Sequence, residues 1–182
     1  MNRLVYIVPV LGFLVLAGFL FKSLILPSPD ILPSALIDKP APPVALAAMD
    51  AQTPGFSSAD LHAGHVTVVN YFASWCVPCR MESAQLMTLS KMPGVTLYGV
   101  DYEERQPGAG RGFLNELGNP YGRIVADDHG TEGMDWGVYG VPETYVVDGK
   151  GVIRFKLVGP LTPDALARQL LPAMEKAKMA MP

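Results

Sequence analysis

The sequence predicts an α/β domain, with a central β-sheet flanked by helices, preceded by one N-terminal transmembrane helix. From about residue 44 onward, β-branched apolar runs alternate with helix-like segments, which is typical of α/β folds. A long apolar run opens the chain, and a proline-rich stretch separates that run from the domain. The length of 182 residues fits one domain of ordinary size after these two segments.

Residues 1–26 are expected to form a membrane anchor. Residues 4–21 contain no charge, and a run of this length can span the core of a bilayer. A cleaved signal peptide is the alternative, but its apolar stretch is normally ~7 to 15 residues long and is followed by a small-residue cleavage site. The small-residue step nearby, at residues 16–18, lies inside the apolar run. We therefore expect an uncleaved anchor.

Residues 27–43 are expected to form an extended spacer. Prolines recur through this stretch and block helix formation, because proline lacks the backbone N–H that a helix requires. The prolines are Pro27, Pro29, Pro33, Pro40, Pro42 and Pro43. The globular domain is then expected to cover residues 44–182.

Strand and helix patterns follow one another through the domain. Strands are expected at residues 66–72, 95–101, 122–126, 144–148 and 152–158. Helices are expected at residues 76–91 and near residues 112–117. A final helix is expected after Thr162, which suits an N-cap, with Pro163 in its first turn. The sequence Asp-Gly-Lys-Gly between the last two strands predicts a hairpin turn.

The charge balance argues against nucleic acid as a partner. The chain has 14 Lys and Arg against 17 Asp and Glu, for a formal net charge of −3. The few basic residues are spread thinly, so the sequence predicts no basic face for a phosphate backbone.

The candidate chemistry lies in the two cysteines, Cys76 and Cys79, placed between the most apolar strand and a helix. Side chains three residues apart on a helix lie on one face, so the two sulfurs can close a disulfide. Cys76 is expected at the helix N-terminus, where unpaired N–H groups and the helix dipole stabilise a thiolate. Cys76 is therefore the expected nucleophile, and Cys79 the resolving thiol.

Two other interpretations of the cysteine pair are weaker. A structural disulfide that closes so short a loop would stabilise the fold little. A metal site shared with His62 and His65 is disfavoured, because the strand at residues 66–72 would separate the two pairs by ~20 Å. We expect both histidines in an exposed turn, and we expect no metal and no other cofactor.

Three segments resemble known proteins. Residues 69–82, VNYFASWCVPCRME, are similar to the active-site segment of the thioredoxin superfamily, and residues 137–145, GVYGVPETY, are similar to its cis-proline segment. Residues 114–121, LNELGNPY, together with the apolar leader and the proline spacer, resemble the DsbE/CcmG thiol:disulfide interchange proteins of cytochrome c maturation. The similarity covers about residues 40–178 and implies a thioredoxin-like fold with a mixed β-sheet.

The resemblance also implies a substrate-binding segment. The bond before Pro142 is expected to be cis, which frees the N–H and C=O of Val141 to pair with an extended substrate strand. The alternative is a trans proline in a turn. Trp75 is expected at the rim of the site, with a core position as an equally weighted alternative, and Trp136 is expected only to pack.

One departure from thioredoxins concerns the acid near the resolving cysteine. The resemblance implies a buried aspartate that helps to deprotonate this thiol, but the chain has Asn70 at its position. Glu82, three residues after Cys79 on the same helix face, is the first candidate to replace it. Glu143, next to Pro142, is the second candidate, and it is also expected to belong to the substrate-binding segment. A solvated glutamate without a chemical role is the equally weighted alternative for Glu82.

The charged stretch that begins at Asp101 is longer than a minimal thioredoxin connection requires. Such an insertion is a place where partner specificity can lie, because loops tolerate variation and carry binding residues. A solvated loop without a specific role is the favoured alternative.

The resemblance implies an oxidoreductase held by a single pass in the bacterial inner membrane, with its catalytic domain in the periplasm. It would reduce a disulfide of apocytochrome c or of a partner thiol protein, and a membrane dithiol reductase would return the electrons. The reduction potential, and with it the direction of electron flow, is left open by the sequence. The alternatives are a disulfide-forming oxidase, a redox-inert binding module, and a copper-delivering thioredoxin-fold protein using His129.

Overall fold

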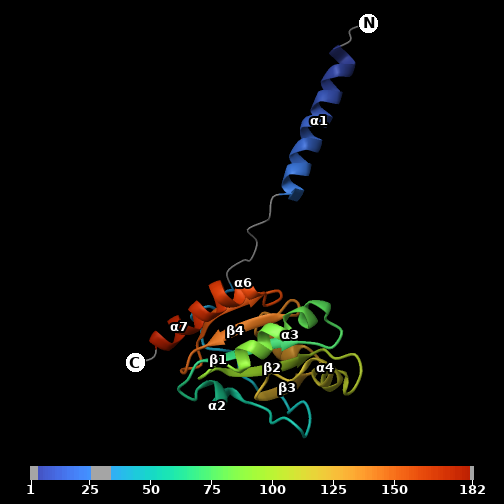
Figure 1. The fold of residues 1–182 in the computed structure, drawn as a ribbon. Helices are drawn as coiled ribbons and strands as arrows, with labels where there is room; N and C mark the ends of the chain where they lie inside the picture. Colours follow the sequence, from blue (N-terminus) through green and yellow to red (C-terminus); the bar gives the residue numbers. More distant parts are fainter. Residues whose placement is uncertain (1–3, 26–33, 181–182) are drawn as a thin grey trace. The chain divides into compact units, whose positions relative to one another are not determined.

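The structure is a computed structural model that describes residues 4–25 and 34–180, which belong to two separate units (Figure 1). The first unit contains helix α1, Leu4–Ile25, with Pro9 inside it. The side chains of this helix are described over residues 6–22. Within the described part of the chain no helix is long and apolar enough to cross a membrane, so the expected N-terminal transmembrane helix is not supported. The second unit carries the cysteine pair.

The second unit is built on a five-stranded mixed sheet with the order β3-β2-β1-β4-β5. The strands are β1 Thr67–Phe72, β2 Thr96–Tyr102, β3 Arg123–Asp127, β4 Glu143–Val147 and β5 Ile153–Val158. The first three strands run parallel, whereas β4 is antiparallel to β1 and to β5. The expected strands and the hairpin of β4 and β5 are therefore confirmed, with shifts of one residue at strand ends.

Helices cover both faces of this sheet (Figure 1). Alternate side chains of β1 point to opposite faces, so that Val68 and Phe72 pack with α3, α4 and the C-terminal helices, whereas Val69 and Tyr71 face Trp136. The helices are α2 Ser58–Leu61, α3 Val77–Ser90, α4 Ala109–Leu117, α5 Thr131–Asp135, α6 Pro163–Ala165, the π-helical segment η1 Leu166–Leu170, and α7 Leu171–Met179. With helices on both faces, every residue of β1 is buried.

The helices agree in part with the expectations from sequence. The segments expected at residues 76–91 and 112–117 are α3 and α4, and Thr162 caps α6 by accepting a hydrogen bond from the N–H of Ala165 at 3.1 Å. The sequence did not indicate α2 and α5, because helices of four and five residues are too short to display a helical period.

Residues 34–43 do not form the expected spacer but pair with the edge of the sheet. The N–H of Asp38 donates to the C=O of Ile153 at 2.8 Å, and the N–H of Ala41 donates to the C=O of Gly151 at 2.7 Å. Leu36 and Ile37 pack on the same apolar cluster as Tyr71. Residues 35–38 form a turn, and the chain after it pairs with the sheet edge at Pro40 opposite Val152, so these residues belong to the domain.

Residues 26–33, which include the first prolines of the expected spacer, lie outside the described residues. The start of the spacer therefore remains a prediction.

Two neighbouring strands bring distant segments of sequence to one end of the sheet. Tyr71, near the C-terminal end of β1, pairs with Glu143, the first residue of β4. The chain leaving β1 enters α3 through Cys76, and the chain entering β4 passes through Pro142. The register of β1 and β4 thus places the cysteine segment beside the proline segment.

Candidate active site

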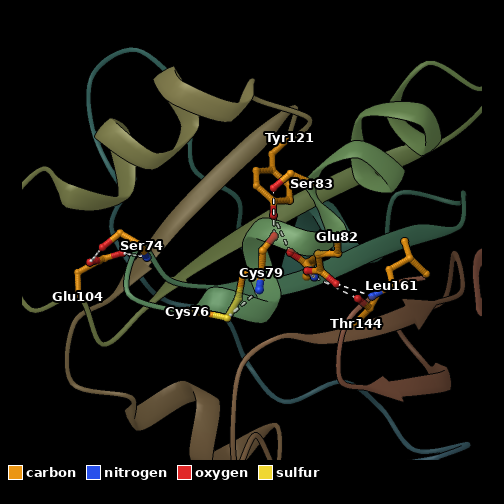
Figure 2. The surroundings of a disulfide bond; sticks show 10 residues. Ser74, Cys76, Cys79, Glu82, Ser83, Glu104, Tyr121, Thr144 and Leu161 are labelled. Atoms are coloured by element: carbon orange, nitrogen blue, oxygen red, sulfur yellow. Dashed lines mark hydrogen bonds between the residues drawn. A yellow bond between two sulfur atoms is a disulfide. The ribbon is translucent and has the colours of Figure 1, made fainter. Parts of the chain in front are cut away.

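The two cysteines occupy the N-terminus of α3 and form a disulfide (Figure 2). Cys76 is the N-cap residue, and its Sγ accepts a hydrogen bond from the N–H of Cys79 at 3.0 Å. The N–H of Cys76 donates to the C=O of Ala73 at 3.2 Å, which closes the turn that follows β1. In the reduced protein, the same helix N–H would favour the thiolate form of Cys76.

The segment before β4 has the geometry that the resemblance implied. The Val141–Pro142 peptide bond is cis, and Pro142 is buried while Val141 is half-buried. Among the described residues, no group forms a hydrogen bond with the backbone N–H or C=O of Val141. These groups are free to pair with an extended polypeptide, as the binding of a substrate strand requires.

Trp75 lies at the surface beside the disulfide. Its side chain is 38% exposed, its indole N–H donates to the C=O of Glu103 at 3.0 Å, and the Arg105 guanidinium lies 4.9 Å from its ring centre. The rim position is therefore supported over a core position. Trp136, in contrast, is fully buried, as expected for a residue that only packs.

Exposed apolar side chains lie in the two segments that carry the buried cysteines and the cis-proline. Val77 and Met81 from the first turns of α3 and Tyr139 from the segment before Pro142 are each more than two-thirds exposed, at 68%, 69% and 71%. Exposed large apolar groups next to a reactive centre are suited to contact a polypeptide substrate.

Glu82 is fully buried on α3, one turn after Cys79 (Figure 2). Its Oε1 accepts a hydrogen bond from the side-chain amide of Asn70 at 2.9 Å, and its Oε2 accepts one from the N–H of Leu161 at 2.7 Å. The same Asn70 amide donates to Thr144 at 3.1 Å. The solvated alternative for Glu82 is therefore wrong, since both carboxylate oxygens have protein partners.

The environment of Glu82 suits proton transfer near neutral pH. Burial raises its pKa from the ordinary 4.5 to about 7, although the hydrogen bonds from Leu161 and Asn70 oppose this rise. Cys79 and Glu82 are three residues apart and buried on the same face of α3. An acid with a pKa near neutrality can accept the proton of a thiol and return it later.

Asn70 cannot supply this proton transfer itself, but it orients the group that can. Its side-chain oxygen accepts a hydrogen bond from the hydroxyl of Tyr121 at 2.6 Å, which fixes the amide with its N–H groups toward Glu82 and Thr144. Tyr121, Thr144 and the N–H of Leu161 were not singled out from the sequence. A buried asparagine in a central strand signalled that polar partners must exist, but not which residues they are.

Glu143 lies on the opposite face of the sheet from Glu82. It pairs with Tyr71, whereas the neighbouring pair Asn70 and Thr144 faces α3. Its Oε2 accepts from the hydroxyl of Tyr145 at 2.8 Å and contacts Nζ of Lys156 at 2.9 Å. The structure therefore brings Glu82, and not Glu143, to the face on which Cys79 lies.

The three histidines lie in loops at the surface. His62, His65 and His129 are all exposed, in agreement with the expected turn at residues 62–65. Within the residues that the structure describes, no group of His, Cys, Asp or Glu is arranged to hold a metal ion.

A cysteine pair at a helix N-terminus, a cis-proline with free backbone groups, and a buried acid define a thioredoxin-fold dithiol/disulfide oxidoreductase. Family comparison agrees, since residues 37–171 match the redoxin family. The chain belongs to this family and, within it, to the DsbE/CcmG thiol:disulfide interchange proteins.

Individual relatives support this assignment. The chain is 42% identical to the thiol:disulfide interchange protein HelX of Rhodobacter capsulatus, over 90% of this chain and 93% of that protein. It is 40% identical to DsbE of Pseudomonas aeruginosa, over 97% and 96% of the two chains. A crystal structure from Chlorobium tepidum, assigned to the DsbE proteins, has a TM-score of 0.58 and 27% identity, covering 74% of this chain and 95% of that one.

Replacing each cysteine by serine should separate their roles. The variant Cys79→Ser should accumulate a mixed disulfide with an oxidised protein substrate, because no second thiol is left to resolve it. The variant Cys76→Ser should form no adduct under the same conditions. Non-reducing electrophoresis and mass spectrometry after thiol alkylation measure both outcomes. An adduct on Cys79 in the Cys76→Ser variant would reverse the assignment.

Replacing Glu82 by glutamine should slow resolution of the mixed disulfide and abolish its pH dependence near pH 7. Stopped-flow measurement from about pH 5 to 9 tests this over the range of the thiol and carboxyl pKa values. The control is Glu116→Gln, which removes an exposed carboxylate of α4 paired with Arg80. Resolution that is equally fast in the Glu82→Gln variant at every pH would leave Glu82 with a structural role only.

The same group should also couple stability to pH in the oxidised protein. The pKa of Glu82 is higher in the folded than in the unfolded protein, so protonation of Glu82 stabilises the fold. This stabilisation is complete below about pH 4.5 and is lost as the pH rises to about 7. Relative to Glu82→Gln, the free energy of unfolding of the wild type should therefore fall by about 3 kcal/mol across this window. Urea titrations at several pH values measure this difference.

Proposed function

We propose that the protein reduces a disulfide of apocytochrome c, or of a partner thiol protein, during cytochrome c maturation in the bacterial periplasm. The observation that carries the proposal is the burial of Glu82 on the same face of α3 as Cys79, three residues further on; burial raises the pKa of Glu82 to about 7, which allows proton transfer without a metal or a nucleotide. The segments that resemble cytochrome c maturation proteins, and the similarity to HelX and DsbE over nearly the whole chain, support the choice of pathway.

The reaction transfers two electrons to the substrate. The Cys76 thiolate attacks one sulfur of the substrate disulfide, and the other substrate sulfur leaves as a thiolate that takes up a proton. Cys79 then loses its proton to Glu82 and attacks Sγ of Cys76, which releases the second substrate thiol. The protein is left with the Cys76–Cys79 disulfide, and a membrane dithiol reductase would reduce it again.

The substrate would bind as an extended segment. Its backbone would pair with the N–H and C=O of Val141, and its apolar side chains would contact Val77, Met81 and Tyr139. An oxidised c-type haem attachment segment, Cys-x-x-Cys-His, fits this extended binding mode, because its disulfide closes a loop of few residues within an accessible peptide.

A peptide reduction assay tests the proposal. The reduced domain should reduce an oxidised Cys-x-x-Cys-His peptide of an apocytochrome faster than it reduces glutathione disulfide, because the longer peptide can pair with the backbone of Val141 and also contact the exposed apolar side chains. A redox titration against glutathione should give a potential near −200 mV or lower, within the range of thioredoxins and glutaredoxins, whose values are roughly −200 to −270 mV. A potential of about −120 mV with rapid oxidation of the reduced peptide would favour the disulfide-forming oxidase instead.

Residues 1–26 would hold the domain at the inner membrane. The uncharged run at residues 4–21 of the sequence supports this role. A single anchor raises the effective concentration of the domain near a membrane-bound electron donor.

Removal of residues 1–26 tests the anchor. The truncated protein should be soluble and exchange thiols at the wild-type rate in solution, whereas the full chain should stay in carbonate-washed membranes. In cells, the truncated protein should support less cytochrome c maturation at equal abundance. A mature N-terminus of the full-length protein downstream of Gly18 would contradict an uncleaved anchor and indicate signal cleavage.

A further inference from the structure

The loop after β2 holds the residues that precede Cys76. The carboxylate of Glu104 accepts hydrogen bonds from both the backbone N–H and the hydroxyl of Ser74, the latter at 2.6 Å. Figure 2 shows this pair to the left of the disulfide, with Glu82 to the right. Ser74 belongs to the turn in which the C=O of Ala73 accepts the N–H of Cys76, so Glu104 restrains the turn that places the nucleophile.

The two neighbours of Glu104 add contacts to the next residue, Trp75. The C=O of Glu103 accepts the indole N–H, and the guanidinium of Arg105 lies over the ring. Glu103 itself has a φ of 46°, in the left-handed region that few residues other than glycine adopt. Residues 103–105 thus hold both Ser74 and Trp75 in place. In the described part of the chain, Glu104 is the only residue whose carboxylate accepts hydrogen bonds from Ser74.

Glu104 lies close enough to Asp101 for the two carboxyl groups to interact, and both residues line the same cavity beside α4; Asp101 is 5% exposed. Within the described residues, no N–H or hydroxyl group donates to Oδ1 of Asp101. The carboxyl packs against α4 at Gly110, where a Cβ atom would collide with it. Two carboxyl groups can share a hydrogen bond only if one of them carries a proton.

The charged groups around Asp101 favour retention of that proton. Asp128 follows β3, and Asp50 belongs to the N-terminal segment; both bear negative charge toward Asp101. Arg111 of α4 is the nearby cation, but Asp50 and Thr53 occupy its guanidinium. Burial first, and then the charge of Glu104, raise the pKa of Asp101 to about 8.

We propose that Asp101 is a protonated hydrogen-bond donor to Glu104, and that the two are positioning residues that hold Ser74, Trp75 and the Cys76 thiolate in place for exchange. Loss of the proton would leave the buried carboxylate of Asp101 against the half-buried carboxylate of Glu104, and their repulsion would draw Glu104 away from Ser74. Thiol exchange would then have an upper pH limit that is set by Asp101 and not by the thiols. This inference rests on the exchange chemistry of the family and not on the identity of the substrate.

Tryptophan fluorescence of the oxidised full-length protein tests the proposal, because disulfide-bonded cysteines do not titrate. The wild type should show a transition near pH 8 from Trp75, in a titration from about pH 6 to 9.5 that ends below the ordinary tyrosine pKa. Asp101→Asn should abolish the transition, since asparagine keeps a donor of equal size that cannot ionise. Glu82→Gln should retain it, and Trp75→Phe should remove the signal.

Exchange kinetics test the positioning role. At pH 7, Glu104→Gln should slow the attack of Cys76 on glutathione disulfide by about tenfold, since loss of a charged hydrogen-bond acceptor typically has an effect of this size. Asp101→Asn should match the wild type at pH 7 and exceed it at about pH 9, beyond the titration of Asp101. Asp101→Leu, which lacks a donor, should behave like Glu104→Gln.

Two results would overturn the proposal while leaving thiol exchange intact. One is a fluorescence transition near pH 8 that persists in Asp101→Asn. The other is a rate ratio between Asp101→Asn and the wild type that is the same at every pH. Urea unfolding of each oxidised variant checks that the compared proteins are folded. An absence of exchange in the wild type would instead refute the proposed function.

Discussion

The complete burial of the Glu82 carboxyl group is the constraint on which the rest of the site depends. A buried carboxylate is costly unless donors satisfy its oxygens, so β1 must supply the Asn70 amide and the turn after β5 must supply the N–H of Leu161. Asn70 then requires Tyr121 and Thr144. These partners come from separate elements, so one acid fixes the relative placement of α3, β1 and β4. The same burial raises the pKa that the chemistry uses.

Acidic groups lie on two sides of the disulfide and have different roles. Glu82 is suited to move a proton, whereas Glu104 holds the turn before Cys76 through Ser74. Negative charge near a thiolate opposes the stabilising effect of the helix N-terminus. Burial raises the pKa of Glu82 to about 7 and that of Asp101 to about 8, so neither carries a full negative charge near neutral pH. Their unfavourable effect on the thiolate is thereby reduced. On the opposite face of the sheet, next to the proline segment, Glu143 forms an ion pair with Lys156.

Local patterns were sufficient for the elements and for the reactive pair. Strand runs and helix caps depend on neighbours in sequence, and this is why the strands, the N-cap at Thr162 and the helix that begins after Cys76 agree with the structure. The cysteine spacing and the proline segment likewise identified the chemistry. The same local reasoning did not place residues 34–43, because their partner strand, β5, is more than a hundred residues away in the chain.

The sequence by itself therefore determined the α/β class, the cysteine pair, and two candidate acids. Only the tertiary structure decided between those acids, since Glu82 and Glu143 each belong to one of the two motif segments in sequence but lie on opposite faces of the sheet. It also decided that Asp101 meets Glu104, and Glu104 meets Ser74, in a stretch that the sequence favoured as a solvated loop. The physical reason is that the pKa of a carboxyl group depends on burial and on charges brought close by folding, and neither is a property of adjacent residues.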